Sequence, residues 1–326
     1  MDSKSLCDTA VLELAEKIRG GSARALSRGL SWIEAGGERA EALVEALYPG
    51  SPWAHIVGIT GAAGAGKSTL VTGLAKEARR RGISVGILAV DPSSPFTGGA
   101  ILGDRVRMSD LSGDEGVFIR SMAARGELGG LCAAAAGGID VLRAAAKQLV
   151  LVETVGVGQD EVDIMRVAHT TVLVSVPGLG DDVQMMKAGL FEIADIHVVN
   201  KADREGAAET IAQIRAMLAL GSNRQASGSA SWQPPVLSTV ALRGEGVAAV
   251  LDTITAHVAH LRESGERQAR DRAIAEARVL KLAQMMIAES LRRPDATSAD
   301  VDRVARREES PYACAKKLIE KARPTA

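Results

Sequence analysis

Aromatic residues are scarce in this chain of 326 residues: Phe, Trp and Tyr together make up only 2% of it. Hydrophobic residues nevertheless account for 46%, so a core must be built mainly from Ala, Val, Leu and Ile, which pack closely. This composition favours helices packed on a parallel sheet. The length is typical of one large α/β domain that carries extensions.

Cysteine is equally sparse, and its placement argues against a disulfide framework. Cys7, Cys132 and Cys314 lie far apart in the sequence, and none belongs to a C-x-x-C pair. Isolated thiols are typical of proteins in a reducing compartment. We therefore expect a cytoplasmic protein.

Long uncharged hydrophobic runs and an excess of charge of one sign are also missing. The most apolar longer stretch, residues 131–152, is interrupted by Asp140, Arg143 and Lys147, which a membrane-spanning helix would not carry. Residues 1–10 lack the apolar core of a signal peptide. The formal net charge is −1, so overall charge does not steer the chain to nucleic acid or to an anionic membrane. We expect neither among its partners.

The motif G-x-x-x-x-G-K-S is what the chain does contain, within residues 58–69. It follows a strand-like run at residues 53–60 and precedes a helical pattern at residues 70–80, which is the setting of a phosphate-binding P-loop. Backbone N–H groups of such a loop and the N-terminus of its helix bind phosphate oxygens. The predicted loop residues are Gly61, Ala62, Ala63, Gly64, Ala65, Gly66, Lys67, Ser68 and Thr69. Lys67 would neutralise the β- and γ-phosphates, and Ser68 would contact Mg²⁺.

A second motif, N-K-x-D at residues 200–203, predicts the base. The Asp203 carboxylate can accept the N1–H and N2–H groups of guanine, whereas adenine would leave a buried carboxylate unsatisfied. Asn200 would help to hold O6 and N7, and the stem of Lys201 would lie along the base. The turn at Val240 and Ala241, after the last predicted strand, could supply a backbone N–H to O6. GTP or GDP is the expected nucleotide.

Acidic residues at the ends of predicted strands suggest the metal site. Asp91, Asp104 and Glu153 would join Ser68 around Mg²⁺, because this hard ion takes oxygen ligands. The alternative is that each acid is a strand-end or loop residue that caps a neighbouring helix. Gln159 could orient an attacking water or could simply cap a helix beginning at residue 160.

The periodicity of apolar residues divides the chain into three parts. Residues 9–19 and 23–47 show helical spacing, and a Pro-Gly-Ser-Pro sequence at 49–52 ends this extension. Short apolar runs, typical of strands buried on both faces, follow at residues 84–91, 117–120, 149–153, 171–176, 196–199 and 235–240. Residues 221–231 are expected to form a surface loop, and the pattern beyond residue 246 is helical. We predict a helical extension at 1–50, a P-loop G domain with a mostly parallel doubly wound α/β sheet at 51–262, and a helical arm at 263–326.

Two further groups of residues have no secure assignment from chemistry alone. Asp181, Asp182, Gln184 and Lys187 follow a predicted strand, and the acids suit the positive end of a helix as well as they suit a functional loop. His257 and His260 lie three residues apart, but no Cys or acidic cluster beside them suggests a metal site.

Taken in order, these motifs resemble those of the MeaB/ArgK-type GTPases, bacterial relatives of the human methylmalonic aciduria type A protein. The matching segments are GITGxxGxGKST, AVDPSS, TGGxILGD, LVETVGVGQ, GDDxQ and NKAD. The resemblance covers residues 10–265 well and the arm more loosely. It implies a SIMIBI-class G domain, Mg²⁺-dependent GTP hydrolysis and a homodimer formed through the C-terminal arm. The implied partner is an adenosylcobalamin-dependent acyl-CoA mutase, whose cofactor loading and protection are gated by GTP.

The resemblance also assigns roles to individual residues. The predicted catalytic set comprises Lys67, Glu153, Gln159 and Lys187. The resemblance implies that Asp181, Asp182, Gln184 and Lys187 form a switch that relays the nucleotide state to the mutase. The chain departs from the family at Ala62 and Ala63, where Val-Pro is usual, at Ala188 and at Val240. These departures suggest a divergent branch, whose client is either methylmalonyl-CoA mutase or a related mutase that acts on another acyl-CoA.

Three other functions are compatible with a P-loop. A GTPase that delivers a metal ion usually has Cys- or His-rich tracts, and this chain has none. A kinase, as in the older transport-kinase assignment of this family, needs a base for the acceptor hydroxyl, and the sequence offers no clear candidate. A nucleotide-bound adaptor that does not hydrolyse GTP is the third alternative.

Overall fold

A computed structural model of the chain describes residues 3–92, 111, 113–124, 130–154, 166–178, 190–222, 232–291 and 294–321. Several predicted functional residues lie outside these ranges, namely Asp104, Gln159, Asp181, Asp182, Gln184 and Lys187, and so does most of the surface loop expected at 221–231. The structure describes Asp91 by its backbone alone, at the end of a strand.

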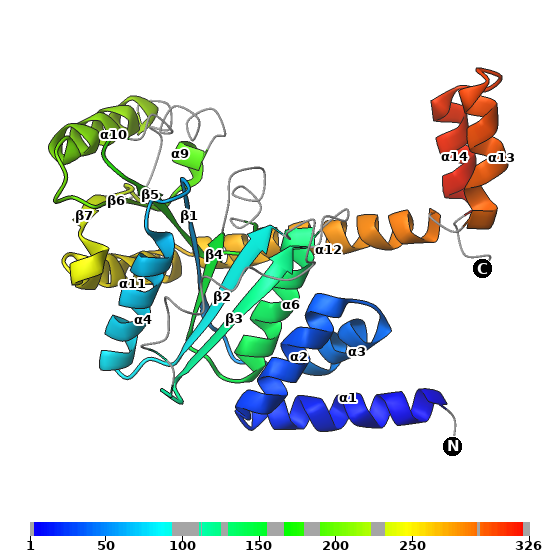
Figure 1. Cartoon of the computed structure of the whole chain (residues 1–326), viewed down its shortest axis with the longest axis horizontal. Coiled ribbons are helices and arrows are strands. Elements are labelled where there is room, and N and C mark those ends of the chain that lie inside the picture. Colours follow the sequence, from blue (N-terminus) through cyan, green and yellow to red (C-terminus); the bar gives the residue numbers. More distant parts are fainter. Residues whose placement is uncertain are drawn as a thin grey trace.

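Seven parallel strands form one twisted sheet in the order β3-β2-β4-β1-β5-β6-β7. This arrangement confirms the predicted doubly wound α/β fold, with β1 at the centre of the sheet (Figure 1). Because the strands are parallel, all their carboxyl ends meet at one edge. The strands are β1 (His55–Gly61), β2 (Val85–Pro92), β3 (Val117–Ala124), β4 (Leu149–Thr154), β5 (Thr170–Ser175), β6 (Ile196–Asn200) and β7 (Val236–Thr239).

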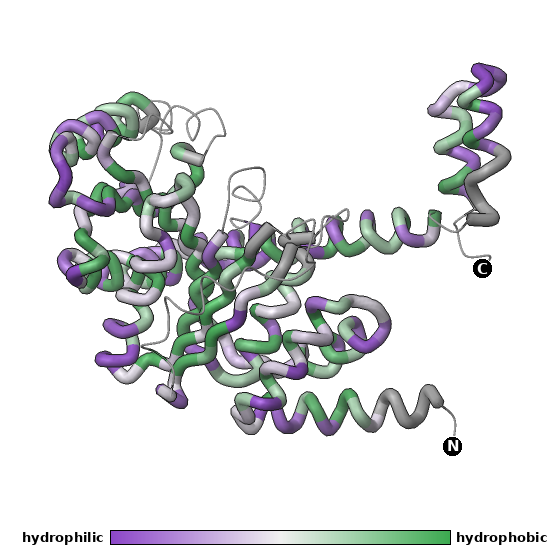
Figure 2. The backbone as a smooth tube through the Cα atoms, viewed as in Figure 1, coloured by the Kyte–Doolittle hydropathy of each residue, from purple (hydrophilic) through white to green (hydrophobic). Residues whose placement is uncertain are grey.

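Both faces of the sheet are covered by helices, which explains why the strands are continuous apolar runs (Figure 2). One face packs on α4 (Lys67–Arg80) and α11 (Val247–Glu263). The other face packs on α6 (Gly130–Ala144) over β2 and β4 and on α10 (Ala207–Ser222) over β6 and β7. A short helix, α9 (Leu190–Ile193), precedes β6, and a 3₁₀ turn, η3 (Ala241–Arg243), follows β7.

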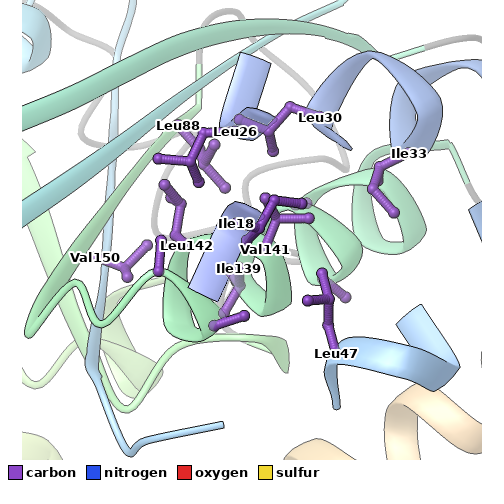
Figure 3. Packing of buried hydrophobic residues seen from close by; sticks show 14 of the residues in the cluster. Ile18, Leu26, Leu30, Ile33, Leu47, Leu88, Ile139, Val141, Leu142 and Val150 are labelled. Atoms are coloured by element: carbon purple, nitrogen blue, oxygen red, sulfur yellow. The ribbon is translucent and has the colours of Figure 1, made fainter. Parts of the chain in front are cut away.

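Three helices, α1 (Ser3–Arg19), α2 (Ala23–Ala35) and α3 (Glu38–Leu47), pack against α6 and form a single core with it (Figure 3). Ser22 caps α2 as its position predicts, because its hydroxyl accepts a hydrogen bond from the Ala25 N–H. The single helix expected at 23–47 is wrong. Gly36 and Gly37 adopt φ values of 71° and 78°, which end one helix and begin another although the apolar spacing continues across them.

The C-terminal arm consists of α12 (Glu266–Leu291), α13 (Pro294–Ala305) and α14 (Pro311–Lys321). Figure 1 shows α12 running beside the sheet and then away from it, to a helical hairpin of α13 and α14. None of the α12 residues is buried. Its outer half exposes large apolar side chains: Val279, Leu280, Leu282, Met286 and Ile287. Within the described ranges, no helix has both the length and the apolar character needed to cross a membrane.

Ion pairs attach the inner half of α12 to the body of the protein. Arg270 donates from Nη1 and Nη2 to the two carboxyl oxygens of Asp195, at 2.9 and 3.0 Å. Two helical turns further along α12, Arg278 contacts Asp140 of α6. Asp140 is only 2% exposed. Burial raises the pKa of Asp140, and Arg278 opposes this rise. Two acidic residues far from the arm in the sequence, Asp195 and Asp140, therefore attach α12 to the body of the protein.

A series of hydrogen-bonded, buried polar side chains lies at the amino edge of the sheet. It is next to the root of the arm, which is the first part of α12, around Arg270. His55 Nε2 is 2.7 Å from Thr170 Oγ1, which is 2.8 Å from His257 Nδ1. His257 Nε2 lies 3.4 Å from Asp195 Oδ1. Trp53 stacks on His55 with 5.9 Å between ring centroids. These contacts join β1, β5 and α11 to the segment that binds Arg270.

Candidate nucleotide-binding site

The predicted P-loop connects the centre of the sheet to α4, at the carboxyl edge. Gly61 is the last residue of β1, and α4 begins at Lys67 with Gly66 as its N-cap in the left-handed region (φ 86°). A Cβ on Gly61, where φ is 142°, would clash with the Val174 carbonyl of the neighbouring strand. The first glycine therefore lets β1 pass close to β5, and the last allows the chain to enter the helix.

Lys67 lies over the loop that it belongs to. Its Nζ donates to the carbonyl oxygens of Gly61 and Ala62, at 2.7 and 3.1 Å, and the residue is only 6% exposed. The loop thus surrounds its own ammonium group. A buried cation at a helix N-terminus provides positive charge where a polyphosphate would bind.

Ser68 and Glu153 meet at the start of α4. The Ser68 hydroxyl donates to Glu153 Oε1 at 2.6 Å, and Glu153 is 1% exposed. Pairing of Ile59 with Glu153 in the β1–β4 ladder brings the acid to the P-loop. These two predicted metal ligands are therefore in contact, and their hard oxygen atoms suit Mg²⁺. Asp91 ends β2, the strand next to β4, but its side chain is outside the description.

The N-K-x-D motif at residues 200–203 is hydrogen-bonded directly to the predicted phosphate loop. The Asn200 side-chain amide donates from Nδ2 to the Ala65 carbonyl at 2.8 Å, and Lys201 Nζ donates to the Gly64 carbonyl at 2.7 Å. A Cβ on Gly66 would clash with Asn200 Nδ2. Two motifs that are about 130 residues apart in the sequence are therefore parts of one site.

Asn200 also joins the loop after β7 to this site. Its Oδ1 accepts hydrogen bonds from the Thr239 hydroxyl at 3.1 Å and from the Ala241 N–H at 3.0 Å. The Ala241 N–H, predicted to face guanine O6, is thus directed to Asn200, and Val240 precedes it as the N-cap of η3. Sequence reasoning missed this bracing role of Asn200, because nothing in N-K-x-D indicates which backbone groups its amide will contact.

Asp203 lies at the outer rim of the site with 41% of its side chain exposed. Its Oδ2 accepts a hydrogen bond from Arg243 Nη1 at 3.2 Å. The guanidinium also pairs with Glu245, two residues away. Neither Arg243 nor Glu245 was predicted as a site residue, although the G-x-G at 244–246 marks a constrained turn beside them.

Within the described ranges, no cluster of three or more His, Cys, Asp or Glu side chains could hold a metal ion. His260 instead packs on Trp232, with 5.5 Å between ring centroids, and His257 belongs to the buried polar series at the amino edge.

Sequence comparison finds relatives over most of the chain. The model of the family described as methylmalonyl Co-A mutase-associated GTPase MeaB matches residues 26–296. A protein of Pyrococcus horikoshii, provisionally named a GTPase, is 46% identical over 310 residues, which cover 95% of this chain and 97% of that protein. GTPase ArgK of Escherichia coli is 35% identical over 265 residues, 80% of each chain. The mitochondrial methylmalonic aciduria type A homolog of mouse is 35% identical over 224 residues, 68% of this chain and 53% of that protein.

Structural comparison agrees on the fold. The crystal structure of a LAO/AO transport system kinase superposes with a TM-score of 0.69 and covers 98% of both chains. Sequence identity in this superposition is 23%, so it shows a shared fold.

Proposed function

Because this chain belongs to the family of methylmalonyl-CoA mutase-associated GTPases, as its motifs predict, we propose that it binds GTP and GDP with Mg²⁺ and hydrolyses GTP. The observation that carries the proposal is the pair of hydrogen bonds from Asn200 and Lys201 to the P-loop. These bonds join the motif predicted to bind guanine to the motif predicted to bind phosphates, so the two motifs can contact one nucleotide.

The phosphates would bind at the start of α4. Residues 61–69 supply backbone N–H groups, and Lys67 exchanges its two carbonyl contacts for phosphate oxygens. Little covalent chemistry falls to the protein in phosphoryl transfer, so positioning and charge neutralisation provide most of the catalysis. In this proposal Glu153, Gln159 and Lys187 complete the catalytic set.

Ser68 and Glu153 would hold the magnesium ion, with Asp91 and Asp104 acting directly or through water. The 2.6 Å contact between the Ser68 hydroxyl and Glu153 gathers two hard oxygen donors of the type that Mg²⁺ prefers. Bound Mg²⁺ supplies positive charge against the β- and γ-phosphates. Burial of Glu153 keeps its carboxylate from turning to solvent.

Asp203 would read the base, and one substitution tests this. Asp203→Asn reverses the donor and acceptor at the guanine edge, so we expect weaker GTP binding and stronger xanthosine triphosphate binding, measured by nucleotide titration. Lys67→Ala should abolish GTP turnover while the circular dichroism spectrum stays unchanged. Unchanged GTP affinity in Asp203→Asn contradicts the guanine assignment, and continued hydrolysis in Lys67→Ala contradicts the phosphate assignment.

The family name supports a partner as well as a reaction. We propose that the protein is a chaperone that gates cofactor loading and protection of an adenosylcobalamin-dependent acyl-CoA mutase, methylmalonyl-CoA mutase or a related one. Asp181, Asp182, Gln184 and Lys187 would form the switch that reports the nucleotide state. Capture of a cobalamin enzyme from cells by the tagged protein, with GDP and with a non-hydrolysable GTP analogue, tests this role. Recovery of no cobalamin enzyme with either nucleotide contradicts it.

The assembly is part of the same proposal. Each subunit of the proposed cytoplasmic homodimer consists of the extension at 1–50, which shares a core with the G domain at 51–262, and the arm at 263–326. The arm is the expected dimer contact, because its outer half projects from the body and exposes apolar side chains, among them Leu280 (57% exposed) and Met286 (56% exposed). Exposed apolar surface of this kind is usually covered by a partner.

A further inference from the structure

One side chain bridges the two loops that would enclose the base. Arg243, in η3, donates from Nη1 to Asp203 Oδ2 at 3.2 Å. The same guanidinium is gripped by Glu245, with Nε to Oε1 at 2.6 Å and Nη2 to Oε2 at 3.4 Å. The two-point contact with Glu245 therefore fixes the orientation of the guanidinium plane. The fixed guanidinium in turn donates its hydrogen bond to the Asp203 carboxylate from a defined direction.

The turn that carries Arg243 has little freedom of its own. Val240 and Glu245 pair as an isolated antiparallel bridge, with the Val240 N–H 3.0 Å from the Glu245 carbonyl. Gly244 and Gly246 both adopt positive φ, and a Cβ on Gly246 would clash with the Ser238 carbonyl. The bridge to Val240 and the two flanking glycines thus fix the backbone of Glu245, so its side chain accepts the Arg243 hydrogen bonds from a fixed position.

Electrostatics favours the same arrangement. The hydrogen bond to Arg243 lowers the pKa of Glu245, and the hydrogen bonds to the carboxylates raise the pKa of Arg243. One cation therefore lies between two anions at the rim of the site. Without Arg243, Asp203 and Glu245 would repel each other, and the half-exposed Asp203 carboxylate could rotate freely.

Guanine binds Asp203 through its N1–H and N2–H groups, which are parallel donors in the plane of the base. Both carboxylate oxygens of Asp203 must therefore lie in that plane. Each carboxylate oxygen has two acceptor sites, so a single bond from Arg243 to Oδ2 leaves enough capacity for both donors of the base. We infer that Arg243 is a positioning residue for base recognition: held by Glu245, it sets the orientation in which Asp203 meets guanine. This inference rests on the proposed guanine role of Asp203.

The test is nucleotide affinity and base preference in Arg243→Ala. Exposed charge pairs are screened by solvent and contribute little, so we expect GTP and GDP to bind only about two- to fivefold more weakly. Turnover should change through KM and not through kcat. Inosine triphosphate lacks the 2-amino group and makes only the N1–H contact, so it should lose less affinity, and the preference for GTP over inosine triphosphate should fall. Arg243→Lys keeps the charge but lacks the planar two-point fork that Glu245 holds, so its affinity and base preference should lie between those of the wild type and Arg243→Ala.

Arg306 offers a matched control in the arm. It forms the same type of exposed pair with a glutamate two residues later, Arg306 Nε to Glu308 Oε1 at 2.9 Å, and Arg306→Ala should leave both affinity and base preference unchanged. Tighter GTP binding by Arg243→Ala would mean that the arginine competes with the base, and an unchanged preference would mean that it does not orient Asp203. Either result overturns the inference. If instead Asp203→Asn fails to alter base preference, the guanine assignment itself fails, whatever Arg243→Ala does.

Discussion

Buried histidines should make the stability of this protein fall steeply in mild acid. His55, His169, His197 and His257 are each at most 7% exposed. Burial is the main cause that lowers their pKa from 6.5, to about 3 for His55 and about 4 for the other three. Each is therefore neutral in the folded protein at pH 5, whereas an unfolded chain would protonate it.

The sign and size of the effect follow from this difference. A lowered folded-state pKa means that the unfolded state binds more protons, so the free energy of unfolding falls as the pH drops from 6.5 toward about 4. At pH 5, about 1.5 units below the unfolded value, each histidine costs about 2 kcal/mol at 1.36 kcal/mol per unit. His55, His169 and His257 influence one another, so the four contributions do not simply add, and their sum of about 8 kcal/mol is an upper bound that is comparable to the whole stability of a typical domain.

His197 allows the prediction to be tested without breaking the buried polar series. It packs on Phe191, with 5.2 Å between ring centroids, and neither ring nitrogen has a hydrogen-bond partner among the described residues. In urea unfolding between pH 6.5 and pH 5, His197→Leu should reduce the pH slope of the free energy of unfolding by about half a proton at pH 6.5, rising to nearly one at pH 5, or about 1 kcal/mol per pH unit on average. Phe191→Leu, which disturbs the same contact without removing a titrating group, should keep the wild-type slope. Equal slopes in wild type and His197→Leu would refute the reasoning.

Two further substitutions test the P-loop and the arm. Gly66→Ala should reduce GDP affinity, measured by titration, because alanine at φ 86° is strained and its Cβ would displace the Asn200 amide. Gly64→Ala is the control, since it has φ 75° but open space around its Cβ. It introduces the backbone strain alone and should therefore lose clearly less GDP affinity. Leu280→Glu should convert the proposed dimer to a monomer in light scattering, whereas Leu220→Glu, at a 75% exposed site on α10, should not; a dimer that survives Leu280→Glu excludes this face of α12 as the contact.

The sequence predicted the sheet well because its strands carry their own signal. Runs such as residues 149–152 are apolar at every position, which is typical of a strand covered on both faces, and the structure buries every residue of β4. The break between α2 and α3 was missed for the opposite reason. Leu26, Leu30, Ile33, Leu43 and Leu47 all reach one core, so the spacing of apolar residues did not reveal that Gly36 and Gly37 turn the chain between them.

Contacts between distant charges could not be predicted at all. Asp195 meets Arg270 and Asp140 meets Arg278 across 75 and 138 residues, and each is an ordinary charged residue in its local sequence. The same holds for Arg243 at Asp203. A motif identifies which residues have the chemistry for a ligand, but the side chains that orient them are decided by packing of the whole fold.

The route from nucleotide to partner can be narrowed from the same contacts. Strand β6 has Asn200 of the candidate site at one end and follows Asp195, the acceptor of Arg270 from the arm. All five residues of β6 are buried, and a close-packed interior resists local rearrangement. We therefore expect a nucleotide-dependent change to involve residues 181–187, the predicted switch that follows β5 in the sequence, while the root of the arm stays fixed to the body of the protein.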